Sequence, residues 1–277
     1  MLSKSLPFLL IVAIASGLLL LFNYFAPLEA TSVAVYAGLT IALAGLASVV
    51  KPLRFFAIRS RRTGLLVLVA GMAVTFAGLF WPAHSVRIAA RHNHLDEVLP
   101  EYQFVERHEV RIHATPERVA AAMEETTFDD IRVFVALMQV RAMAYGRFRR
   151  MPSPGRRKIL ATFANPRSGF VPLYQDSREV VMGMAGRPWA NAPALGLDGA
   201  AGFAAYDAPD AMKTAFNLLV EDEGGGWSRV VTETRARGTD GEGTRRMARY
   251  WRLIYPGSGM IRRMWLNAIR DRAERAS

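Results

Sequence analysis

The sequence predicts an α+β fold, in which N-terminal transmembrane helices precede a domain with a curved antiparallel sheet around one long C-terminal helix. Three observations support this prediction. Three stretches near the N-terminus contain no Asp, Glu, Lys, Arg or His. Short β-type segments separated by Gly, Pro and Asp follow them, and the chain ends in a long amphipathic helical pattern.

The uncharged stretches cover residues 6–26, 31–50 and 63–83. At ~1.5 Å per residue each would form a helix of ~30 Å, about the thickness of the hydrocarbon core of a bilayer. We therefore expect three membrane spans. A cleaved signal peptide is the alternative for the first stretch. However, Leu28-Glu29-Ala30 lacks the small residue expected two positions before a cleavage residue.

The domain organisation follows from where the charged residues begin. We expect the membrane region over residues 1–83, a polar linker over 84–100 and one domain over 101–277, which is long enough to bury a core. The loop at residues 51–62 holds five basic residues, whereas residues 27–30 hold only Glu29. The positive-inside rule therefore predicts a multi-pass membrane protein whose domain lies outside the cytoplasm, in a bacterium in the periplasm.

Composition excludes some chemistry. The chain has no cysteine, which excludes disulfides, thiolate metal ligands and cysteine nucleophiles. Its net charge is +11, and Arg far outnumbers Lys, which we attribute to a GC-rich genome. Nine arginines between Arg245 and Arg275 predict a solvated helix face, with contact to anionic headgroups as the alternative. No nucleic-acid motif accompanies the charge, so we expect no nucleic-acid partner.

Residues 102–113 alternate as a half-buried strand, with Glu106 and His108 on the mostly apolar face. Thr115-Pro116-Glu117 predicts a helix start, and a second helix begins near Phe128. Further strands are predicted over residues 159–164, 170–174, 178–184, 202–206, 212–220 and 227–237, with an irregular flap over 183–202 and a turn at 224–226.

The C-terminal part has the clearest pattern. Apolar residues recur at helical spacing from Met247 to Ile254 and again from Ile261 to Ile269, with a break predicted at residues 256–259. Arg262 belongs to the opposite, charged face in this interpretation. Six or seven strands curved around such a helix would leave an apolar hollow, a typical site for small apolar ligands.

Three glycines in the third stretch, Gly64, Gly71 and Gly78, are seven residues apart. They share one helix face, so a neighbouring helix can approach closely, and we expect helix–helix association there.

Several segments resemble the START-like, or SRPBCC, superfamily with its helix-grip fold. Phe104-x-Glu106-Arg107-His108 followed by Thr115-Pro116-Glu117-Arg118-Val119 is similar to that family's entry strand and helix. Thr232-Glu233-Thr234-Arg235, and the segment from Tyr250-Trp251 to Arg262-Arg263, resemble a bacterial polyketide cyclase-like branch. The resemblance covers roughly residues 101–273 and implies a cavity for lipids, sterols, polyketides or similar molecules. Many members only bind such molecules and a few catalyse a reaction.

Catalytic signals are weak. Glu106 and His108 share a strand face and are the candidate acid–base pair, but we favour the alternative that they are hydrogen-bonded or solvated near the sheet edge. His92 and His94 fall in the expected linker, and His108 and His113 on opposite faces of one strand. We therefore expect no metal site, and no nucleotide or cofactor motif is present.

The candidate ligand-binding residues are one charged pair and four aromatic residues. Glu233 and Arg235 lie on one face of their strand and would anchor a polar group, unless they pair with neighbours on the outer face of the sheet. The aromatic candidates are Trp189, Tyr206, Phe216 and Trp251, which are equally suited to core packing.

These observations favour a membrane-anchored module that binds a lipid or other hydrophobic small molecule without breaking a bond. A cyclase- or dehydratase-type enzyme is the first alternative. A membrane assembly protein with a closed cavity is the second.

Overall fold

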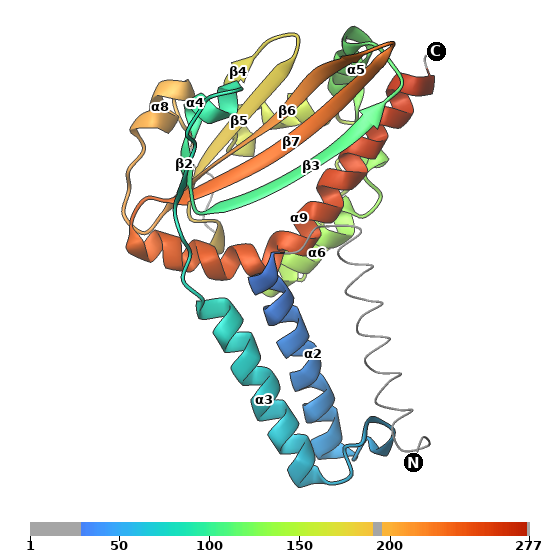
Figure 1. Ribbon diagram of the computed structural model, residues 1–277, viewed down its shortest axis with the longest axis vertical. Helices are drawn as coiled ribbons and strands as arrows, with labels where there is room; N and C mark the ends of the chain where they lie inside the picture. Colours follow the sequence, from blue (N-terminus) through green and yellow to red (C-terminus); the bar gives the residue numbers. More distant parts are fainter. Residues whose placement is uncertain (1–28, 191–195, 276–277) are drawn as a thin grey trace. The chain divides into compact units, whose positions relative to one another are not determined.

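The computed structural model describes residues 29–190 and 196–275 (Figure 1). The first predicted span, residues 6–26, lies outside the described residues. The chain divides into two compact units. The first comprises the residues up to Pro82 together with Trp251–Pro256, and the second comprises Ala83–Tyr250 with the residues from Gly257 onward.

The first unit contains two long apolar helices, α2 (Ala30–Val50) and α3 (Arg61–Phe80), with a 3-10 turn, η2 (Arg54–Phe56), between them. The Ser60 hydroxyl caps α3 by accepting a hydrogen bond from Thr63 N at 3.1 Å. By length and composition, both helices are able to cross a membrane. They coincide with the second and third stretches expected from the sequence.

Small residues let α2 and α3 pack closely. A Cβ added to Gly71 would lie 2.3 Å from Ala42 N, and one added to Gly45 would lie 2.3 Å from Leu68 N. Gly64 and Gly78 also face α2 of the same chain. Gly38 and Gly45, on α2, make the matching approach from the other side. The backbones therefore meet at distances that no larger residue permits.

Arg252 satisfies the free carbonyls at the end of α3. Its guanidinium donates to Leu79 O and Trp81 O, both at 2.7 Å, and to Thr31 Oγ1 at 3.1 Å. The last carbonyls of a helix have no partner within the helix, and a cation there also complements the helix dipole. Although Arg252 is only 1% exposed, its three nitrogens therefore all have acceptors.

The second unit is built on a five-stranded antiparallel sheet with the order β3-β7-β6-β5-β4. The strands are β3 (Phe104–Ile112), β4 (Val171–Gln175), β5 (Glu179–Gly186), β6 (Met212–Gly224) and β7 (Trp227–Gly238). The strands β6 and β7 form the predicted hairpin, whose turn uses positive φ angles at Gly224, Gly225 and Gly226. A separate pair joins β1 (Val86–Arg87) to β2 (Glu101–Tyr102).

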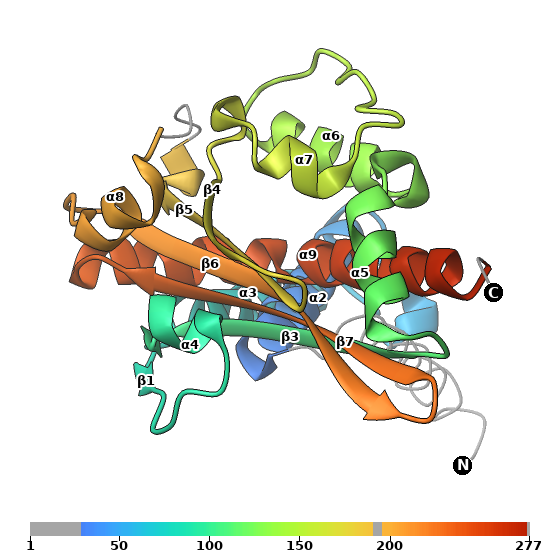
Figure 2. The same ribbon diagram turned by 90° about the horizontal axis from the view of Figure 1, so that it is seen from above.

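Helices cover both faces of this sheet (Figure 2). The unit contains α4 (His94–Val98), α5 (Pro116–Glu125), α6 (Phe134–Ala144), α7 (Ile159–Phe163), α8 (Gly199–Ala205), α9 (Gly241–Arg275, apart from Trp251–Pro256), η3 (Phe128–Asp130), η4 (Pro166–Ser168) and η5 (Pro188–Ala190). One core cluster joins α9, α5 and α7 to the sheet, and a second joins α4 and α8 to the opposite face.

The observed class is therefore α+β, with an apolar helix pair, an antiparallel sheet and a long C-terminal helix, as predicted. Three details of the sequence interpretation were wrong. Residues 159–164 and 202–206 are not strands, because they belong to α7 and α8. Their short apolar runs have no clear period, and α8 is rich in alanine, the strongest helix former. The large sheet accordingly has five strands instead of six or seven.

The third error is the predicted break at residues 256–259. Helix α9 runs continuously from Gly241 to Arg275 with Pro256 inside it. A proline removes one backbone hydrogen bond and crowds the carbonyl four residues earlier. The buried residues on both sides of it, among them Trp251, Tyr255 and Trp265, supply packing that outweighs this loss.

Candidate functional site

A buried carboxylate lies between β3 and α9. Glu106, on β3, is 2% exposed, and its Oε1 is 2.8 Å from His108 Nε2. Its other oxygen, Oε2, accepts a hydrogen bond from the Ser258 hydroxyl on α9 at 2.7 Å. Strand alternation puts Glu106 and His108 on the same face, and β3 is an edge strand of the large sheet. Both carboxylate oxygens therefore have partners inside the domain.

Arg262, one helical turn after Ser258, is a partly buried cation whose guanidinium lies against the aromatic core. Its guanidinium carbon lies 4.1 Å from the centre of the Phe216 ring and 5.5 Å from that of Trp265. Burial lowers the pKa of Arg262 to about 10, against the opposing effect of the Glu106 charge. Its Nη1 is enclosed and has no hydrogen-bond partner among the described residues. Such a group is costly unless something satisfies it.

Aromatic rings surround this cation. Phe216 packs edge-on against Phe163 at 5.8 Å, Phe170 at 5.7 Å and Trp265 at 6.1 Å between ring centres. This aromatic cluster occupies the region that the sequence predicted to be hollow. Apolar side chains that stay partly accessible border the same core: Val110, Phe134, Phe163, Phe170, Ile261 and Met264. An apolar ligand would therefore meet these side chains first.

A second polar network lies on the opposite face of the sheet. Arg235 Nη2 donates to Asp96 Oδ1 at 2.6 Å, and its Nε donates to Glu233 Oε1 at 2.6 Å. Its guanidinium also lies 4.9 Å from the centre of the Tyr102 ring. Burial alone would raise the pKa of Asp96, but hydrogen bonds from His92 N and Arg235 outweigh burial and lower it.

Glu179 extends this network. Its Oε2 accepts from His94 N at 2.8 Å and lies 3.0 Å from His94 Nδ1, and its Oε1 accepts from Asn217 Nδ2 at 2.7 Å. Asp96 and Glu179 thus fasten α4 to the sheet, with Leu95 fully buried beside them. Residues 84–100, expected as a linker, therefore contain a packed helix. The network satisfies its own charges, so we assign it a structural role.

The structure brings only some of the sequence candidates together. Glu106 and His108 bond to each other, and so do Glu233 and Arg235, but Glu233 and Arg235 lie on the face away from α9. The aromatic candidates are dispersed: Phe216 is in the aromatic cluster, Trp189 is in η5, Tyr206 ends α8 and Trp251 belongs to the first unit.

The sequence interpretation also misplaced Arg262 on the charged face of the C-terminal helix. Arg262 precedes Trp265 by three residues and Ile269 by seven, so it shares their buried face. This spacing was the signal that could have identified it. Ser258 was missed because it falls in the predicted break.

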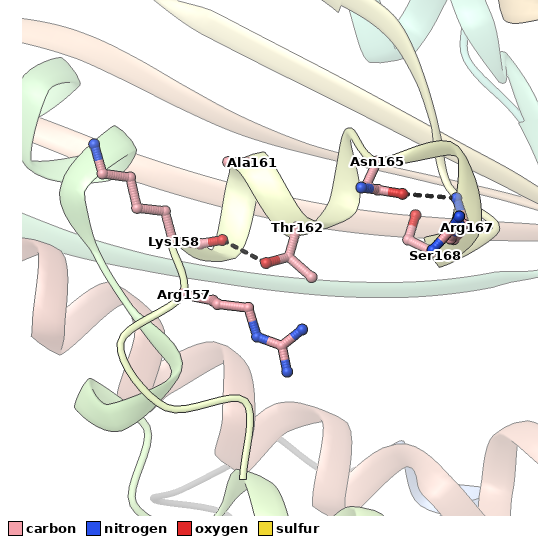
Figure 3. A pocket seen from close by; sticks show the side chains of 7 residues that line it. All are labelled: Arg157, Lys158, Ala161, Thr162, Asn165, Arg167 and Ser168. Carbon is pink, nitrogen blue, oxygen red and sulfur yellow. Dashed lines mark hydrogen bonds between the residues drawn. The ribbon is translucent and has the colours of Figure 1, made fainter. Parts of the chain in front are cut away.

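Two hollows open at the surface of the second unit. One, of about 560 Å³, is lined by Arg157, Lys158, Ala161, Thr162, Asn165, Arg167 and Ser168 (Figure 3). The other, of about 720 Å³, is lined by Val135, Arg149, Arg150, Met151, Pro152 and Ser153. Both rims are basic. Their chemistry suits an anionic group better than an apolar ligand.

Neither site has the ligands of a metal centre, since no group of three or more His, Asp or Glu residues in the described part of the chain is arranged to hold an ion. Comparison of the chain with protein-family models, with curated proteins and with solved structures gave no match.

Proposed function

We propose that this chain is a membrane-anchored domain that binds a hydrophobic molecule carrying an anionic group, with Arg262 as the polar anchor. The observation that carries the proposal is the enclosed Nη1 of Arg262, which has no hydrogen-bond partner among the described residues. A carboxylate or phosphate oxygen of a ligand would supply the acceptor that is missing. Charge-assisted hydrogen bonds of this kind contribute about 1.5–3 kcal/mol each.

The apolar part of the ligand would pack on the half-accessible side chains around the aromatic cluster. Phe134, Ile261 and Met264 each leave apolar surface accessible at the edge of the core. Burying such surface contributes roughly 25 cal/mol per Å². A fatty acid or a phospholipid combines these features in one molecule. An anionic amphiphile is the proposed ligand class because Arg262 and accessible apolar surface lie side by side.

The fold order supports the START-like resemblance as part of this proposal. The first long strand pairs with the last, and the C-terminal helix covers the sheet face that carries Glu106 and Phe216. Helices α2 and α3 would serve as the membrane anchor. Five basic residues from Lys51 to Arg62, between the helices and at the start of α3, favour placing the domain outside the cytoplasm.

The proposal is tested by identifying what co-purifies with the full chain. The chain is extracted in mild detergent, and bound lipids are identified by mass spectrometry. Arg262→Met should lose a specific anionic lipid that the wild type retains. Arg270→Met is the matched control, because Arg270 lies on the same helix and pairs with Asp271 at the surface. Equal lipid content in all three proteins would contradict the proposal.

The buried pair of Glu106 and His108 keeps an enzyme as the second candidate function. A carboxylate that contacts both an imidazole and the Ser258 hydroxyl has the partners needed for proton transfer. Glu106→Gln with His108→Asn would abolish turnover while leaving ligand binding intact if the domain is an enzyme. If the bound molecule undergoes the same chemical change, or none, in wild type and variant, a carrier is favoured instead.

A further inference from the structure

The positive charge of this chain is concentrated in one segment. Residues 131–175 contain nine Lys and Arg residues and no Asp or Glu, in a chain whose net charge is +11. This segment includes α6, the loop that follows it, α7 and the whole of the edge strand β4. Within the described residues, Lys158 pairs with Glu125, but Arg147, Arg149 and Arg150 have no carboxylate partner. The electrostatic potential at this surface is therefore positive.

Helix α6 presents an apolar face to solvent. Ala136, Val140, Met143 and Ala144 are exposed at positions i, i+4, i+7 and i+8, so they form one stripe. Val140 is 65% exposed and Met143 is 47% exposed. The other side of α6 packs toward the core through Phe134. The helix is therefore apolar on both sides, and even its core-facing side is only partly buried.

The loop after α6 adds aromatic and basic side chains beside this stripe. Phe148 is 74% exposed and stands between Arg147 and Arg149. Gln139 of α6 ties the loop down: its amide donates to Arg149 O at 3.3 Å and accepts from Met151 N at 2.7 Å. In Figure 2 the loop extends outward from the sheet. We call Val140, Met143, Arg147, Phe148, Arg149, Arg150 and Met151 the α6 patch.

We propose that the α6 patch docks on the surface of an anionic lipid bilayer. Exposed apolar and aromatic residues next to unpaired arginines match the boundary between acyl chains and headgroups in apolarity and in charge. The hollow bordered by Arg149, Arg150 and Ser153 offers space for a headgroup phosphate. Soluble monomers rarely leave apolar surface of this kind open to water.

The inference rests on the proposed membrane anchoring, which would hold the domain close to a bilayer. A short segment between Phe80 and Val86 connects α3 to β1, and α9 contributes Trp251–Pro256 to the first unit. With the domain held to an anchor in this way, the local concentration of lipid headgroups is high, so individually weak contacts suffice. Each arginine near an anionic surface favours the docked state by about fivefold.

The test uses the full chain, which has no cysteine, so that one introduced thiol is labelled uniquely. The Phe148→Cys variant carries a spin label and is reconstituted into nanodiscs of phosphatidylcholine, either alone or with 30% phosphatidylglycerol. Ser177→Cys, in the exposed turn before β5, is the control site. We expect phosphatidylglycerol to make the Phe148 label accessible to oxygen and protected from a water-soluble relaxant. The Ser177 label should not change.

Removing two charges measures the electrostatic part. Arg149→Gln with Arg150→Gln should shift the ratio of docked to undocked label about 25-fold toward the undocked form. Arg178→Gln with Arg237→Gln changes the net charge equally at two exposed sites elsewhere and should have little effect. Docking should also weaken in high salt.

Three outcomes would overturn the proposal. The label could stay in water in both lipid compositions, it could be protected by single-stranded RNA but not by phosphatidylglycerol, or its protection could depend on protein concentration instead of lipid. Alkaline carbonate extraction of the same samples reports the anchor separately. A chain that is extracted would refute the anchoring, whereas an embedded chain with a water-exposed label would refute only the α6 patch.

Discussion

Two arginines on α9, ten residues apart in sequence, should respond in opposite ways to the same substitution: Arg252 is buried, and Arg262 is partly buried with an enclosed Nη1. Arg262 has an enclosed nitrogen without a partner in the described structure, whereas Arg252 donates to three oxygen atoms. Replacing each with methionine keeps a long unbranched side chain and removes the guanidinium. We expect Arg262→Met to stabilise the ligand-free protein and Arg252→Met to destabilise it.

The expected size follows from the two environments. The lowering of the Arg262 pKa to about 10 corresponds to about 3 kcal/mol of unfavourable burial. The cation–π contact of Arg262 with Phe216 offsets about 1 kcal/mol of this penalty. The net gain from Arg262→Met should therefore be about 2 kcal/mol. Loss of Arg252 leaves the carbonyls of Leu79 and Trp81 without their donor, at a cost of about 2–4 kcal/mol.

The pH dependence has a definite sign. A lowered pKa means that the unfolded state binds the proton of Arg262 more strongly than the folded state does. The penalty is therefore fully present below pH 10 and is relieved as the pH rises through about 10. The wild type should gain stability in that alkaline range, and Arg262→Met should lack this gain.

The assay is urea denaturation of the delipidated full chain in detergent, followed by tryptophan fluorescence at neutral pH. Hydrogen exchange at β6, which carries Phe216, and at the end of α3 assigns each effect to its unit. A loss of more than about 1 kcal/mol of unfolding free energy in Arg262→Met would contradict this prediction. It would equally fail if both variants shifted stability in the same direction by similar amounts.

Two further predictions concern other parts of the chain. Asp96→Asn should cost roughly 2–4 kcal/mol at neutral pH by leaving Arg235 with a weaker partner, and should speed hydrogen exchange in α4. Because the pKa of Asp96 is lowered, the wild type should lose this stabilisation below about pH 4, so the unfolding free energies of wild type and Asp96→Asn should converge in acid. A difference between them that stays constant down to pH 2 would contradict this prediction. Gly71→Leu should separate α2 from α3, because a Cβ added at Gly71 would already lie 2.3 Å from Ala42 N. The control Gly202→Ala should be tolerated, because the nearest atom to a Cβ added there is 3.4 Å away. Equal protease resistance of both variants would count against this packing of α2 and α3.

Periodicity in the sequence was sufficient to predict the parts of the fold that have one buried face. The strand at residues 102–113 alternates between a mostly apolar and a mostly polar face, and the structure buries Phe104, Glu106 and His108 while exposing their neighbours. The hairpin of β6 and β7 followed from two long β-type runs around three glycines. By contrast, residues 159–164 and 202–206 are too short for a period to distinguish helix from strand.

The candidate site was only partly predictable. The pairing of Glu106 with His108 follows from strand alternation, because i and i+2 share a face. The partners from distant elements, Ser258 and Arg262, depend on how α9 lies across the sheet, which no local pattern specifies. Arginine was also assigned to solvent by its usual preference, so its enclosure among aromatic rings went against the average behaviour of that residue type.

We propose that Arg262 binds the anionic group of an apolar molecule, and thermal stability measures this. Delipidated wild type and Arg262→Met are compared as a long-chain fatty acid or an alkyl phosphate is added, with the corresponding alcohol as control. A ligand at a hundred times its dissociation constant stabilises the folded state by about 2.7 kcal/mol. The anionic amphiphiles should stabilise the wild type and not Arg262→Met, and the alcohol should stabilise neither protein. Equal stabilisation of both proteins, or an equal response to the alcohol, would rule out this role of Arg262.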